Sequence, residues 1–110
     1  MEVNILGTKY DFSVDDLNNP DLAQNDGICK IYDKGIVIRN PAYMPGETEE
    51  TRERRYEHVL RHEIIHAFAE ESGVSYGDNE DLVDWIAAMI PRINAVYEEI
   101  QKNELSPANK

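Results

Sequence analysis

The chain has little cysteine, few basic residues relative to acidic ones, and no long apolar run. A single cysteine, Cys29, excludes an internal disulfide bond and favours a reducing compartment, so we expect a cytoplasmic protein. Eleven Lys and Arg residues against 22 Asp and Glu residues leave a net charge of −11. This charge disfavours binding to nucleic acid or anionic lipid, because both require clustered cations. No stretch approaches the ~20 apolar residues of a membrane-spanning helix, and the N-terminus lacks the basic start of a signal peptide. We therefore expect neither a membrane nor a nucleic acid as partner.

The length and composition predict one small domain. A chain of 110 residues with 41% hydrophobic side chains can bury a single modest core. We expect residues 1–105 to form this domain and residues 106–110 to fray as a polar tail.

The first third of the chain has strand-like patterning. In residues 3–14, around Gly7, the side chains of Tyr10, Phe12 and Val14 alternate with polar ones, as they do in a half-buried strand. We expect these three side chains, and that of Ile5, to point inward.

A loop, a hairpin and a second loop are predicted next. Residues 15–27 are polar and rich in turn-forming types, which is typical of a loop. Residues 28–32 and 36–39 are β-branched runs on either side of a turn in which Gly35 can supply a positive φ, so they predict a hairpin. Residues 40–48, which contain prolines, predict the second loop.

The second half of the chain is helical in pattern. From about Glu49 the apolar residues recur at steps of three and four, as in an amphipathic helix, and Gly73 can end that helix. Asp78 or Asn79 can cap a second helix, which Pro91 should kink or divide from a third. We therefore expect an α+β fold. A small, mainly antiparallel sheet of three or more strands packs against the first helix, with one or two further helices behind it.

The first predicted helix contains the pattern His62-Glu63-x-x-His66. Four residues advance an α-helix by about 400°, so the two histidines lie on one face and their imidazoles can bind the same ion. The helix places Glu63 beside them, where its carboxylate can accept a proton from a water molecule at the ion. The opposite face of the helix is apolar and can be buried, which leaves these three residues lining a cleft.

A catalytic zinc site requires a third protein ligand. His58 lies one turn before His62, but three ligands from one straight helix spread along its axis, so we interpret His58 as solvent-facing or as a neighbour of a ligand. The carboxylates of Glu80 and Asp84 are the alternatives; one can bind the metal while the other accepts the free ring N–H of a ligating histidine. Acidic residues at a helix N-terminus also stabilise the helix dipole without any metal. Because the histidine pair precedes this acidic cluster in the sequence, we favour Glu80 as the metal ligand over a role limited to the helix dipole.

The pattern His62-Glu63-x-x-His66 followed by Glu80-x-x-x-Asp84 resembles the gluzincin zinc metallopeptidases. The chain length and element order are similar to those of the minigluzincins and the ImmA/IrrE group, which are common in phages and mobile elements. The resemblance implies a minimal zincin fold, one Zn²⁺ per chain on His62, His66 and Glu80, and a contact between Asp84 and a ligating histidine. It also implies that Glu63 is the general base in peptide-bond hydrolysis, with a protein or peptide as substrate.

The resemblance implies further features that the motif itself does not contain. In related enzymes the substrate lies extended beside an edge strand, and residues 35–40 are the candidate here, although they fit the interior of a small sheet equally well. Tyr43, Tyr76 and Tyr97 are candidates to stabilise an oxyanion, and each also fits a packing role. We interpret Cys29 as a small buried hydrophobic residue rather than a nucleophile.

Two other functions stay open at this point. The first is a latent or non-catalytic zinc-binding protein, in which Asn103, Glu104 or Lys110 reaches back to block the fourth metal position, as the resemblance to minigluzincins implies. The second is a metal-free acidic interaction module. The ligand set favours zinc, but iron or manganese suits a related site.

Overall fold

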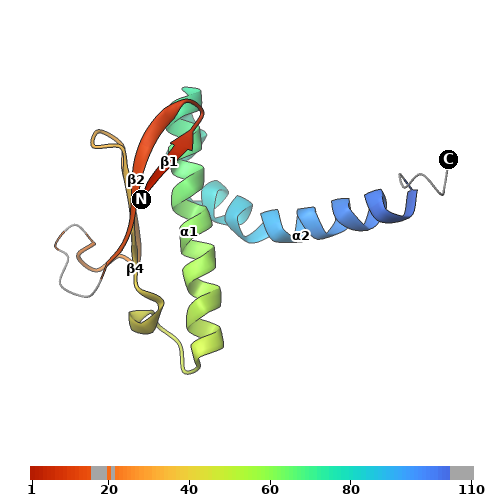
Figure 1. The fold of residues 1–110 in the computed structure, drawn as a ribbon, viewed down its shortest axis with the longest axis horizontal. Helices are drawn as coiled ribbons and strands as arrows, with labels where there is room; N and C mark the ends of the chain where they lie inside the picture. The colour runs from red at the N-terminus through yellow and green to blue at the C-terminus, as the bar shows by residue number, and fades with distance from the viewer. Residues whose placement is uncertain (16–19, 21, 105–110) are drawn as a thin grey trace.

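The computed structural model describes residues 1–15, 20 and 22–104, in which a four-stranded sheet packs against helices (Figure 1). In chain order the elements are β1 (Glu2–Ile5), β2 (Thr8–Asp15), β3 (Gly27–Lys30), β4 (Gly35–Arg39), the 3₁₀ helix η1 (Pro41–Tyr43), α1 (Glu49–Ser72), the 3₁₀ helix η2 (Ser75–Asp78) and α2 (Glu80–Glu104). This order confirms the predicted α+β class. The predicted tail, residues 106–110, lies outside the described residues.

The sheet has the strand order β1-β2-β4-β3. The pairs β1–β2 and β3–β4 are antiparallel, while β2 and β4 run parallel. The sheet is therefore mixed but mainly antiparallel, as predicted. The interpretation of residues 35–40 as an edge strand is wrong, because β4 is hydrogen-bonded on both sides. The edge strand beside it is β3.

Residues 3–14 form two strands and a tight turn. Leu6 and Gly7 adopt positive φ angles of 51° and 92°, which reverse the chain between β1 and β2. Of the side chains predicted to point inward, Ile5 and Tyr10 are buried and Phe12 packs against the core, whereas Val14 is 41% exposed and that expectation is wrong. Val14 is the last residue but one of β2.

The hairpin predicted from residues 28–32 and 36–39 is present as β3 and β4. Its turn differs from the prediction, because Lys34 rather than Gly35 adopts the positive φ, at 54°. Gly35 is already the first residue of β4, paired with β2 on one side and β3 on the other, so its backbone has to be extended.

Helix α1 begins and ends as its sequence predicts. The side-chain oxygen of Thr48 accepts a hydrogen bond from the Thr51 N–H at 3.1 Å, which caps the first turn. Gly73 takes the left-handed conformation, with φ 71°, and its N–H bonds back to the last turn. The predicted helix end at Gly73 is confirmed.

Helix α2 begins after Asn79, whose side-chain oxygen accepts a hydrogen bond from the Leu82 N–H at 3.1 Å. It continues without interruption through Pro91, so the predicted division into two helices is wrong. Proline lacks the N–H that would bond to the carbonyl four residues earlier, which belongs to Ala87. The Nε of Arg61, on α1, donates to that carbonyl at 2.8 Å and replaces the missing bond.

Neither helix of the described chain is both long and apolar enough to cross a membrane.

The core lies between one face of the sheet and α1. A cluster of buried side chains from the sheet, from the segment after η1 and from α1 forms this core. It comprises Ile5, Tyr10, Ile36, Ile38, Met44 and Ala67. Apolar side chains of α1 pack against this cluster, among them Val59, Leu60 and Ile64. The predicted apolar face of α1 is therefore confirmed, and its other face is left for the cleft.

Glu71 fastens the end of α1 to the sheet. Its carboxylate accepts hydrogen bonds from the Thr8 hydroxyl at 2.5 Å, the Tyr10 hydroxyl at 2.7 Å and the Lys34 ammonium at 2.9 Å. These bonds favour the ionised form, so they lower the pKa of Glu71 from 4.5 to about 2. The carboxylate therefore joins α1, β2 and the β3–β4 turn.

Replacing Glu71 with glutamine should destabilise the fold in a pH-dependent way. Because the folded-state pKa of about 2 lies below the ordinary 4.5, the carboxylate stabilises the fold above pH 4.5, and this contribution is lost as the pH falls toward 2. In urea unfolding the wild type should exceed Glu71→Gln in stability at neutral pH, and the difference should shrink across that interval. Glu70→Gln, at the neighbouring exposed position, should match the wild type. A difference that does not change with pH would contradict this role.

Candidate metal centre

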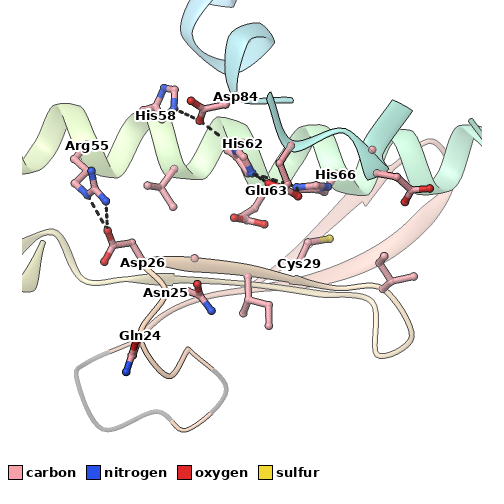
Figure 2. A pocket seen from close by; sticks show the side chains of 17 residues that line it. Gln24, Asn25, Asp26, Cys29, Arg55, His58, His62, Glu63, His66 and Asp84 are labelled. Carbon is pink, nitrogen blue, oxygen red and sulfur yellow. Dashed lines mark hydrogen bonds and ion pairs between the residues drawn. The ribbon is translucent and has the colours of Figure 1, made fainter. Parts of the chain in front are cut away.

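The middle of α1 presents two histidines to a cleft. The Nε2 atoms of His62 and His66 lie 3.2 Å apart, as the four-residue spacing predicts. Both side chains are mostly buried, at 16% and 15% exposure, and they point the same way from the helix (Figure 2).

Glu80 brings a carboxylate to the same point from the first turn of α2. One of its oxygens lies 2.9 Å from His62 Nε2, and the other lies 2.9 Å from His66 Nε2. Gly73 and η2 return the chain from the end of α1, which is how a residue 18 positions after His62 reaches it. The three side chains predicted to bind metal are thus together, in a group able to hold an ion.

These separations suit a tetrahedral metal ion. Two ligands at 2.0–2.1 Å from a tetrahedral zinc ion lie about 3.3 Å apart. The two histidine nitrogens lie 3.2 Å apart, and each lies 2.9 Å from a different oxygen of Glu80. The set of two imidazoles and one carboxylate therefore has the donor chemistry that zinc prefers, in a group close enough to hold an ion.

Asp84 orients the first histidine. Its Oδ1 lies 3.3 Å from His62 Nδ1, and an ionised carboxylate only accepts hydrogen bonds, so Asp84 can accept an Nδ1–H from this ring. In the tautomer with the proton on Nδ1, the lone pair of Nε2 is free to bind a cation shared with the Glu80 carboxylate, 2.9 Å away.

His58 extends this chain of contacts to the rim of the cleft. Its Nε2 lies 2.7 Å from Asp84 Oδ1, and hydrogen bonding to His58 is the main cause that lowers the pKa of Asp84. Of the two predictions for His58, solvent-facing or a neighbour of a ligand, the structure supports the second. The trio of His58, His62 and Asp84 is also close enough to hold an ion. The two groups have His62 in common.

Glu63 points into the cleft beside His62. It is only 9% exposed, and burial raises the pKa of its carboxyl to about 7. The negative charge of Glu80 also raises this pKa, whereas His62 and a hydrogen bond from the Cys29 backbone N–H lower it. The edge strand β3 thus holds the carboxylate that the sequence motif predicts as the proton acceptor.

The cleft has a volume of about 970 Å³ and lies between β3 with its preceding loop and the two helices (Figure 2). Cys29 lines it from β3, and burial raises the pKa of its thiol to about 11, which favours the unreactive form. None of the three tyrosines proposed for an oxyanion lines the cleft; they are 47%, 66% and 59% exposed, in the order Tyr43, Tyr76 and Tyr97.

Asn103, Glu104 and Lys110 were predicted as candidates to block the fourth metal position. The structure describes the side chain of Asn103, which lies away from the cleft. Asn103 is exposed near the end of α2, and its side chain donates to the Glu99 carbonyl at 2.8 Å. Figure 1 shows that this end of α2 points away from the sheet. The side chain of Glu104, and Lys110, lie outside the described residues.

Two arginines secure the loop that enters β3. Arg55 donates to Asp26 Oδ2 through Nε and Nη2, each at 2.7 Å. Arg39 is buried, and its Nη2 donates to the carbonyls of Ala23 and Asn25 at 3.1 and 2.8 Å. Sequence reasoning missed these contacts, because nothing local relates residues of the loop, β4 and α1.

Gly27 is a second residue that sequence reasoning missed. A Cβ atom on it would lie 2.6 Å from Val59 Cγ1, 3.0 Å from Ile38 Cδ1 and 3.2 Å from Glu63 Cγ. Only glycine lets β3 lie this close to α1, beside the carboxylate. A glycine before a strand was the sole available signal.

Gly27→Ala should therefore overpack the contact between β3 and α1 and destabilise the fold by about 1–3 kcal/mol, as measured by urea unfolding. Gly35→Ala is the matched control, since its Cβ would have no neighbour nearer than 3.6 Å. Equal stability of the two variants would show that the close approach at Gly27 is not a constraint.

Comparison of the chain with protein-family models, with curated proteins and with solved structures found no match. A function is therefore inferred from the side chains that meet in the cleft.

Proposed function

We propose that the chain is a zinc metallopeptidase of the gluzincin type, in which His62, His66 and Glu80 hold one Zn²⁺ and Glu63 is the general base. The observation that carries the proposal is the convergence of two imidazole nitrogens and a carboxylate from separate helices, at mutual distances of 2.9–3.2 Å. Peptidases with this ligand set keep the fourth metal position for water or substrate.

The residues around the metal position have distinct roles in this proposal. Zinc, when bound, supplies Lewis-acid activation of a water molecule and of the peptide carbonyl. Glu63 takes a proton from the attacking water and returns it to the amine nitrogen that leaves when the peptide C–N bond breaks. Asp84 accepts the Nδ1–H of His62 and so keeps the Nε2 lone pair available for the metal.

The edge strand β3 replaces β4 as the proposed site of substrate pairing. Among the described elements β3 has a strand neighbour on one side only, and Gly27, Ile28 and Cys29 line the cleft. An extended peptide can bond to such an edge through its backbone, next to Glu63. The proposed substrate is therefore an extended segment of a peptide or protein.

A zinc-binding protein without turnover is the second candidate. The observation that favours it is the position of Tyr43, Tyr76 and Tyr97, none of which lines the cleft. A peptidase needs a donor for the oxyanion, and its loss typically costs about 10²–10³ in rate.

Elemental analysis of the purified, zinc-supplied chain tests the metal centre. The wild type should hold about one zinc per chain, and His66→Ala and Glu80→Ala should each lose most of it, because the ligand set falls from three residues to two. Asp81→Ala, one residue further along α2 and outside this cleft, should keep its zinc. Absence of zinc from the wild type would contradict the proposal, and loss in His66→Ala alone would remove Glu80 from the ligand set.

Glu63→Gln separates the two candidate functions. In a peptidase this variant should keep its zinc but hydrolyse a fluorescently labelled unfolded protein about 10²–10⁴-fold more slowly, since it cannot accept the proton. Glu57→Gln, exposed on the same helix, is the control and should hydrolyse like the wild type. A zinc-loaded wild type that hydrolyses nothing would favour the non-catalytic protein, and undiminished hydrolysis by Glu63→Gln would refute the assigned base.

A further inference from the structure

The outer half of α2 has no packing partner in the described chain. Residues 91–103 are all exposed, and Figure 1 shows this part of the helix leaving α1 and the sheet. The main contacts of α2 are with α1 and η2. A helical segment of this length is marginally stable in water without packing, so a partner would stabilise it.

This outer half carries an apolar stripe. Ile93, Val96, Tyr97 and Ile100 follow one another at steps of three, one and three, which places them on one side of the helix. Each is more than half exposed, at 57%, 57%, 59% and 53% respectively. Ile86, Met89 and Ile90 continue the same side toward α1.

The two flanks of the stripe differ in charge. Arg92 and Glu99 are seven residues apart, so they lie on the same flank, two turns from each other. Asn94 and Gln101, which have the same spacing, lie on the opposite flank and are uncharged. One flank therefore carries a positive and a negative group, and the other carries neither.

We propose that a second copy of this chain covers the stripe, with the outer halves of the two α2 helices packed antiparallel about a two-fold axis. In an antiparallel pair the same flanks meet, so Arg92 lies opposite the partner's Glu99, and symmetry forms this pair twice. In a parallel pair each charged flank meets an uncharged one. The charge pattern is thus self-complementary in the antiparallel arrangement alone, and the proposal is independent of the metal centre.

Sedimentation equilibrium of the full chain tests the association. It should be measured at physiological ionic strength, where the Debye length of about 8 Å screens repulsion between chains of net charge −11. The wild type should dimerise, and Val96→Glu should raise the dissociation constant at least about tenfold, because it buries a carboxylate in the stripe. Ala95→Glu adds the same charge on the opposite side and should dimerise like the wild type.

A charge exchange tests the orientation. Arg92→Glu and Glu99→Arg should each weaken the dimer, and the double variant Arg92→Glu/Glu99→Arg should restore it, since opposite charges then face each other again. All these positions are exposed, so unchanged urea midpoints will show that the domain folds.

Three outcomes would overturn the proposal. A wild type that stays monomeric up to ~0.1 mM would contradict the dimer, and the stripe would then be a binding surface for a different protein or for another segment. A Val96→Glu variant that dimerises normally places the interface elsewhere. A double variant no better than its single parents contradicts the antiparallel arrangement.

Discussion

The hydrogen bond from Arg61 to the Ala87 carbonyl helps to fix where α2 lies, and the proposed metal centre depends on that position. Pro91 leaves this carbonyl without its helical donor, so the contact with α1 satisfies a group that is otherwise unpaired within the helix. Val83 and Ala87 are buried in the same part of α2. This anchoring holds the first turn of α2, and with it the Glu80 carboxylate, against the histidines of α1. The helix thus tolerates Pro91, and the carbonyl that Pro91 leaves without a helical donor helps to position it against α1.

The close packing of β3 on α1 determines the chemistry of the cleft. Because Gly27 has no side chain, the strand covers Glu63, and this burial is the main cause of the raised pKa of its carboxyl. The Cys29 N–H holds the carboxylate from the strand side. Arg55 and Asp26 tie the loop before β3 to the same helix. The burial of the proposed proton acceptor and the position of the proposed substrate edge beside it therefore both depend on one strand–helix contact.

Features that follow from local spacing could be predicted from the sequence. The common face of His62 and His66 and the end of α1 at Gly73 follow from helical geometry. Glu80 was favoured because a zinc site needs a third ligand and the capping signal places this carboxylate at a helix start, and the resemblance implied the same residue. The strand order and the fit of Gly27 depend on residues distant in sequence, so no local pattern contains them. Of the two predicted effects of Pro91, the division of the helix was wrong for the same reason, because the donor that replaces the missing hydrogen bond lies on another element.

X-ray absorption spectroscopy at the zinc edge, on the purified chain, tests the central claim most directly. A site made by His62, His66 and Glu80 predicts only nitrogen and oxygen neighbours at about 2.0–2.1 Å, with the multiple-scattering signal of two imidazoles. A sulfur neighbour at about 2.3 Å would instead implicate Cys29, the one cysteine of the chain. That result, or a spectrum without imidazole, would contradict the proposed metal centre.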